Sequence, residues 1–165
     1  MKILFIGGVK SGKSRLAEAE ILKLSNGMKP YYLATNECFD EEMQARVLVH
    51  KQQRQNAFDT IEEPLHLLET LKQCQRPVLI ECVTMWLNNM LYHQFCEQTI
   101  LDELEAVMKL PMDLVLVHNE VGLGIIPENK LAREFADLSG KAAQLIGQYC
   151  EQVYFCSAGL ALRMK

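Results

Sequence analysis

Hydrophobic residues gather in five short runs, and longer amphipathic stretches separate them. The runs are continuous rather than alternating, which is typical of strands buried on both faces of a parallel sheet. They predict strands at residues 2–6, 31–35, 77–81, 113–118 and 152–156. The stretches between them predict helices at residues 13–25, 40–54, 64–74, 84–109 and 129–150, of which we expect 84–109 to be broken. Strand and helix thus alternate, so the pattern predicts an α/β fold with a mainly parallel sheet covered on both faces.

Composition narrows the class of protein further. A chain of 165 residues with 49% hydrophobic residues suits one domain with a real core, which we expect to span 1–165. Its net charge of −4 argues against a nucleic-acid partner. The sequence shows no signal peptide, and no apolar run approaches the roughly 20 residues of a membrane span. The six cysteines form no Cys-x-x-Cys pair, so we expect reduced thiols in a cytoplasmic protein.

The first strand runs into a glycine-rich loop that a stretch of helix-forming residues follows. The loop reads Gly7, Gly8, Val9, Lys10, Ser11, Gly12, Lys13, Ser14. This order matches a P-loop, whose backbone N–H groups cradle phosphate oxygens at a helix N-terminus. Lys13 would reach the β- and γ-phosphates, and Ser14 would ligate Mg²⁺. A plain glycine-rich turn is the alternative, but the flanking strand and helix favour nucleoside triphosphate binding by a P-loop NTPase-like α/β/α sandwich.

Polar residues follow the other strands, at the sheet edge where ligands of open α/β sheets bind. Ala34, Thr35 and Asn36 come after the second strand. Glu81 ends the third, where a Walker B acid would hold Mg²⁺ through water; the alternative is an exposed strand-end glutamate. The fourth strand leads into residues 119–129, whose polar start would hold substrate or cap the next helix.

A polar stripe on the predicted helix 40–54 is the second chemical feature. Glu42, Arg46, His50 and Arg54 are spaced four apart and share one helix face. The stripe is either a solvated surface or a reactive site. In a reactive site the neighbouring cations would bind phosphate and keep His50 neutral, because like charge lowers an imidazole pKa. A neutral imidazole beside bound phosphates is a competent nucleophile toward an α-phosphate, releasing pyrophosphate.

The remaining histidines are weaker candidates. His66 and His93 lie in apolar helical stretches, where packing or a surface position is the simpler interpretation. His118 ends the fourth strand and could reach the ligand edge. The single tryptophan, Trp86, and Cys82 are expected to pack in the core.

Taken together, these motifs resemble one family: the bifunctional adenosylcobinamide kinase/adenosylcobinamide-phosphate guanylyltransferases of cobalamin assembly. The resemblance covers nearly the whole chain. Its segments are 7–18, 32–35, 40–54, 62–64, 79–91, 119–129 and 158–160. The run 119–129, Asn-Glu-Val-Gly-Leu-Gly-Ile-Ile-Pro-Glu-Asn, is the most family-specific of them. One departure is Arg54-Gln55, where family members usually have Arg-Pro.

The resemblance implies two reactions: phosphorylation of the aminopropanol hydroxyl of adenosylcobinamide by ATP or GTP, then transfer of GMP from GTP to that phosphate. It implies that His50 carries the guanylyl group and that Lys13 takes part in catalysis. It further implies a homotrimer with the corrinoid bound near a subunit boundary. The implied nucleotide contacts are residues 7–14 with Ala34, Thr35, Asn36, Lys51, Gln52, Gln53, Arg54, Glu62 and Glu81, of which Ser14 and Glu81 would hold Mg²⁺.

Two other functions stay open from the residues alone. A P-loop kinase of another small metabolite would transfer the γ-phosphoryl group and form no covalent enzyme–nucleotide species. A nucleotide-responsive switch would hydrolyse slowly and bind a partner in a nucleotide-dependent way.

Overall fold

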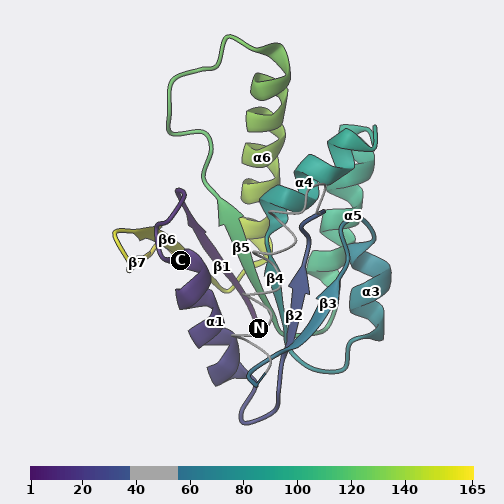
Figure 1. The fold of residues 1–165 in the computed structure, drawn as a ribbon, viewed down its shortest axis with the longest axis vertical. Coiled ribbons are helices and arrows are strands. Elements are labelled where there is room, and N and C mark those ends of the chain that lie inside the picture. Colours follow the sequence, from purple (N-terminus) through teal and green to yellow (C-terminus); the bar gives the residue numbers. More distant parts are fainter. Residues whose placement is uncertain (38–55) are drawn as a thin grey trace.

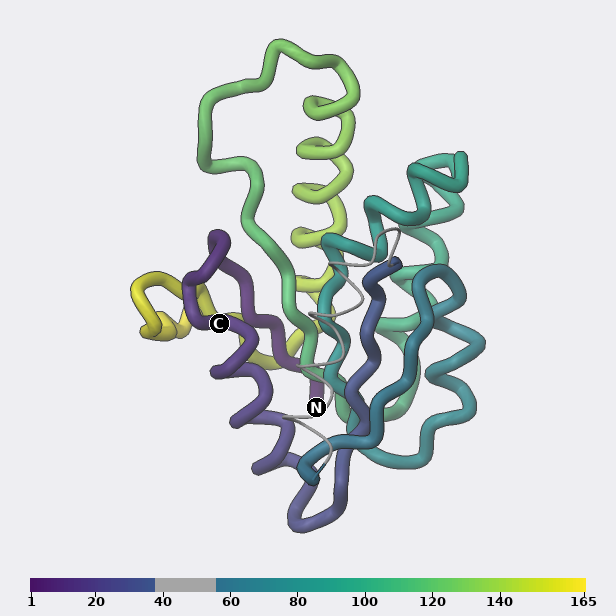
Figure 2. The backbone as a smooth tube through the Cα atoms, in the orientation of Figure 1, coloured from purple at the N-terminus to yellow at the C-terminus, as the bar shows by residue number. Residues whose placement is uncertain are grey.

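The computed structural model describes residues 1–37 and 56–165, which form a sheet flanked by helices (Figures 1 and 2). The predicted helix 40–54 lies entirely outside these residues. Seven strands are described: β1 (Lys2–Gly7), β2 (Tyr31–Ala34), β3 (Asp59–Glu62), β4 (Val78–Glu81), β5 (Leu114–Asn119), β6 (Gln152–Ser157) and β7 (Leu160–Arg163). Their order is β3-β2-β4-β5-β1-β6-β7, parallel except for β7, which pairs antiparallel with β6.

Helices cover both faces of this sheet. They are α1 (Lys13–Leu24), α3 (Leu67–Gln73), α4 (Val83–Tyr92), α5 (Glu97–Lys109) and α6 (Lys130–Tyr149). Alternate residues of β1 enter the two cores: Leu4 packs on the side of α4 and α6, and Phe5 packs on the side of α1. The central strands β1, β4 and β5 are therefore buried on both faces, which confirms the three-layer α/β/α arrangement expected from their continuous hydrophobic runs (Figure 1).

The five strands predicted from the sequence are all present, with ends that shift by a residue or so. The long helical stretch 84–109 is broken as expected, because residues 93–96 separate α4 from α5. The strands β3 and β7 were missed. Each has only four residues, and neither contains a fully buried side chain, so neither leaves the apolar run that marked the others. No helix among the described residues is long and apolar enough to cross a membrane.

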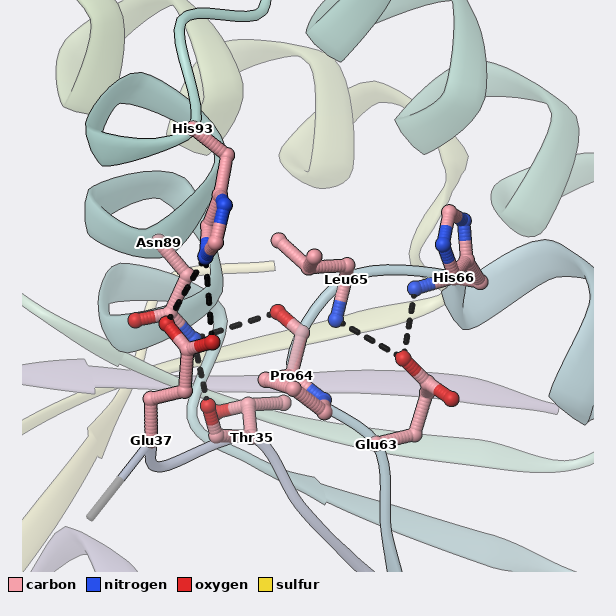
Figure 3. Close-up of polar contacts among 8 residues, drawn as sticks. All are labelled: Thr35, Glu37, Glu63, Pro64, Leu65, His66, Asn89 and His93. Carbon is pink, nitrogen blue, oxygen red and sulfur yellow. Dashed lines mark hydrogen bonds and ion pairs between the residues drawn. The ribbon is translucent and has the colours of Figure 1, made fainter. Parts of the chain in front are cut away.

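A buried amide ties α4 to the carboxyl ends of the neighbouring strands. The Asn89 side chain, 1% exposed, donates to the carbonyls of Thr35 at 2.6 Å and Pro64 at 3.1 Å (Figure 3). Glu63 closes the adjacent turn by accepting N–H groups from Leu65 and His66, which is why α3 begins later than the predicted residue 64. The described start of the loop after β2 is thus tied to α4 by a hydrogen bond.

Replacing Asn89 with Ala should destabilise the protein by about 2–4 kcal/mol, since it leaves the buried Thr35 carbonyl and the part-buried Pro64 carbonyl without this donor. Urea unfolding measures the change. The neighbouring Asn88 is exposed, so Asn88→Ala is the matched control and should stay within about 0.5 kcal/mol of the wild type. Equal effects of the two substitutions would show that the buried amide does not hold this loop.

Candidate nucleotide-binding site

The P-loop lies between the carboxyl end of β1 and the first turn of α1. Its backbone enters left-handed conformations at Lys10, with φ 56°, and at Gly12, with φ 92°. Lys13 is 7% exposed, and its Nζ donates to the carbonyl of Gly8 at 3.0 Å. The buried Ser11 hydroxyl has no hydrogen-bond partner among the described residues. A buried ammonium, an unused hydroxyl and the N-terminus of α1 together suit a bound phosphate.

Two oxygen groups meet beside this loop. The Ser14 hydroxyl donates to Glu81 Oε1 at 3.0 Å, which joins the start of α1 to the end of β4. A hydroxyl and a carboxylate are the oxygen donors that Mg²⁺ accepts alongside phosphate and water. The predicted Walker B position of Glu81 therefore lies next to the predicted serine ligand, from a segment 67 residues away in the chain.

Strand register lines up further predicted site residues on the same edge. Ala34 pairs with Glu62 on one side and with Glu81 on the other. Thr35 is fully buried, and its hydroxyl accepts from the Cys82 N–H at 2.9 Å and donates to the Cys82 carbonyl at 2.8 Å. Its N–H also donates to the Glu81 carbonyl, so Thr35 joins β2 to β4 and presents Ala34 and Asn36 at the edge.

His118 lies beneath the ligand edge, in the core. Its Nε2 is 2.9 Å from the Ser139 hydroxyl and its Nδ1 is 3.4 Å from the Thr84 hydroxyl, so partners on α6 and α4 face both ring nitrogens. Burial lowers the pKa of His118 to about 4; the Lys13 charge adds to this shift, and a hydrogen bond with Ser139 opposes it. The imidazole is therefore neutral and enclosed.

The remaining candidate residues lie either in the core or on the surface. Trp86 is fully buried, and its Nε1 donates to the Leu65 carbonyl at 2.8 Å. Burial, with the Glu81 charge, raises the pKa of Cys82 to about 11, so it remains a thiol in the core. His93 lies 3.0 Å from Glu37 Oε1 (Figure 3), and His66 is exposed.

The loop after β5 begins beside the P-loop and then leaves the body of the molecule (Figure 1). The N–H of Glu120 donates to the Gly7 carbonyl at 3.0 Å. Residues 121–130 are all exposed. The cap of α6 comes from Asn129, whose Oδ1 accepts the Ala132 N–H at 3.2 Å, and not from the polar residues that start the loop.

Comparison with known proteins shows the family of this chain. The model of the family described as cobinamide kinase / cobinamide phosphate guanyltransferase matches residues 3–164. The chain belongs to this family. It is 39% identical to the bifunctional adenosylcobalamin biosynthesis protein CobP of Pseudomonas aeruginosa, over 100% of this chain and 98% of that one. It is 36% identical to the bifunctional adenosylcobalamin biosynthesis protein CobU of Escherichia coli K12, over 100% of both chains.

The fold of this cobinamide kinase/guanyltransferase family member is also seen outside the family. The crystal structure of the flagellar accessory protein FlaH from Methanocaldococcus jannaschii matches it with a TM-score of 0.52 at 13% identity, covering 99% of this chain and 77% of that one. At this identity the likeness concerns the fold alone.

The site residues expected in this family member fall into two groups. Those from the P-loop, β2, β3 and β4 gather along the carboxyl edge of the sheet. His50, Lys51, Gln52, Gln53 and Arg54 lie outside the described residues, so their roles stay predictions. Sequence reasoning also missed Asn89 and the turn after β6, because a single amide and a two-residue turn carry no pattern of their own.

His118 should not titrate between pH 8 and 5, in contrast to an ordinary histidine with a pKa near 6.5. The unfolded imidazole gains its proton near pH 6.5 while the folded one stays neutral. This group therefore lowers the stability of the fold as pH falls from 6.5 towards 4. NMR titration of the His118 ring protons, assigned with His118→Gln, measures the pKa. A midpoint near 6.5 would contradict the enclosed, neutral imidazole.

Proposed function

We propose that this chain carries out both reactions of its family on one P-loop site. It phosphorylates the aminopropanol hydroxyl of adenosylcobinamide with ATP or GTP, and then transfers GMP from GTP to the new phosphate. The observation that carries the proposal is the buried Lys13 beside the Ser14–Glu81 contact, in a chain that matches the family over residues 3–164.

In the kinase step the substrate hydroxyl attacks the γ-phosphorus, and the bond to the β–γ bridging oxygen breaks. Lys13 stabilises the charge that develops on the β- and γ-oxygens, and the loop N–H groups hold the phosphates in line. Ser14 and Glu81 would hold Mg²⁺, which neutralises phosphate charge when bound. Positioning and charge are what phosphoryl transfer requires from a protein, and this cradle supplies both.

Guanylyl transfer needs a nucleophile at the α-phosphorus, and His50 fills this role in the proposal. A neutral ring nitrogen forms a bond to phosphorus while the bond to the α–β bridging oxygen breaks, releasing pyrophosphate. The phosphate of the corrinoid then attacks the phosphoramidate and frees the imidazole. The other three histidines suit the role poorly: His118 is enclosed, His93 faces Glu37, and His66 is exposed just before α3.

We extend the proposal to a homotrimer with the corrinoid near a subunit boundary. Its support in the structure is an exposed apolar arm, defined as Leu123, Ile125, Ile126 and Leu131, with exposed fractions of 77%, 96%, 79% and 65%. Exposed apolar side chains concentrated on one segment mark interaction surfaces. The five cysteines of the described residues are free, which fits the reducing cytoplasm where we place the reactions.

Labelled GTP tests the covalent step. Purified protein is incubated with Mg²⁺ and GTP labelled at the α- or the γ-phosphorus, and then run on a denaturing gel. We expect acid-labile, alkali-stable label from α-labelled GTP only, because a phosphoramidate is cleaved by acid. The label should vanish in His50→Ala and without Mg²⁺. His66→Ala, which removes an exposed histidine, is the matched control and should be labelled like the wild type.

Label retained in His50→Ala would overturn the proposed nucleophile. A protein that binds GTP and forms no labelled species at all would instead favour a plain kinase of a small metabolite, and a screen of acceptor alcohols would follow.

A further inference from the structure

The turn between β6 and β7 lies against the P-loop. Ser157 pairs with Leu160, so only Ala158 and Gly159 form the turn. Both are left-handed, with φ 52° and 79°, as a two-residue hairpin of type I′ requires. The segment 158–160, one of those in which the chain resembles the family, contains this turn, and neither proposed reaction assigns it a role.

Backbone atoms of the turn contact backbone atoms of the P-loop directly. The N–H of Gly159 donates to the Ser11 carbonyl at 2.9 Å. A Cβ placed on Gly12 would lie 2.9 Å from the Gly159 Cα, and one placed on Gly7 would lie 2.3 Å from the Cys156 carbonyl oxygen. Arg15 Nη2 approaches the Gly159 carbonyl at 3.5 Å. The two glycines of the P-loop signature are therefore needed for the approach of β6 and its turn as well as for the shape of the loop.

The hydrogen bond from Gly159 fixes the direction of one peptide unit in the P-loop. In a planar trans peptide the C=O and the following N–H point in opposite directions. Because the Ser11 carbonyl points at Gly159, the N–H of Gly12 points away from the hairpin. Gly12 is the N-cap residue of α1, immediately before Lys13, where the N–H groups that hold phosphate are found.

Core burial does not account for β7, the outer strand of the hairpin. All four residues of β7 are exposed, with Leu160 at 74% and Leu162 at 68%. The strand pairs with β6 alone, at the outer edge of the sheet. At the turn that leads into β7, the Gly159 N–H donates to the Ser11 carbonyl of the phosphate-binding loop.

We propose that the Ala158–Gly159 turn is a positioning element of the nucleotide site, which holds the Ser11–Gly12 peptide so that the Gly12 N–H faces the bound phosphate. Gly159 acts through this peptide and does not touch the nucleotide. The inference rests on the proposed phosphate-binding role of the P-loop. It adds a second loop to the elements that a productive cradle requires.

Two glycines allow a matched test. Gly159 and Gly27 have similar φ values of 79° and 87°, and a Cβ meets nothing closer than 4.0 Å at either position. Gly27 follows α1 at the opposite end from the P-loop. Alanine at each position therefore introduces the same backbone strain, but only at Gly159 does that strain act on the Ser11 carbonyl. Gly159→Asn restores a residue that tolerates the left-handed region.

Calorimetry measures the Tm of each variant and, well below that temperature, its affinity for GTP and for inorganic tripolyphosphate. Both alanine variants should lose similar thermal stability, about 2–4 °C in Tm. Gly159→Ala should bind each probe about tenfold more weakly, because a factor of this size is expected from the loss of one charge-assisted hydrogen bond. Gly27→Ala should bind like the wild type. Gly159→Asn should recover most of the affinity.

Unchanged affinity of Gly159→Ala, in a wild-type protein that binds both probes, would overturn the positioning role and leave the proposed function intact. Failure of the wild type to bind either probe would instead overturn the P-loop assignment on which the proposed function rests. Equal weakening in Gly27→Ala and Gly159→Ala would show that the effect is general destabilisation, and it would also overturn the inference.

Discussion

A buried ammonium organises this site. Lys13 is 7% exposed, and its hydrogen bond among the described residues goes to a single carbonyl, that of Gly8. A lysine charge withdrawn from water with so little compensation is costly, and an anion at the loop relieves that cost. The surrounding groups also favour an anion, because the Ser11 hydroxyl lacks a partner in the described chain and the N-terminus of α1 favours negative charge. These features all suit a bound phosphate, and they support the anion site that we propose for this loop.

The parallel sheet brings the other groups to this anion site. The carboxyl ends of parallel strands share one edge, so the register of β2, β3 and β4 places Ala34, Glu62 and Glu81 in one row. From this position at the end of β4, the Glu81 carboxylate accepts a hydrogen bond from the Ser14 hydroxyl. On the other side of β1, the turn after β6 reaches Ser11. Each of these contacts joins segments that are far apart in the sequence, and the strand order alone makes them neighbours.

Local patterns could be predicted from the sequence, and distant pairings could not. The P-loop was identifiable because eight consecutive residues carry its chemistry, and Glu81 because it ends an apolar strand. The enclosure of His118 depends on Ser139 and Thr84, which come from two helices that a linear pattern does not pair. The turn at Gly159 and the strand β3 were missed for a related reason. Both are short and lie at sheet edges, so burial leaves little mark on their sequences.

The central claim is that one phosphate cradle supports two reactions at two different phosphorus atoms. The most direct measurement runs two reactions with Mg²⁺, one with cobinamide and γ-labelled GTP and one with ready-made cobinamide phosphate and α-labelled GTP, and counts the label in each corrinoid product. The account predicts that wild-type protein transfers both labels and that Lys13→Ala loses both together, while Lys23→Ala, at the far end of α1, keeps both. Loss of γ-label with full retention of α-label transfer in Lys13→Ala would contradict it, because guanylyl transfer would then not use the P-loop lysine.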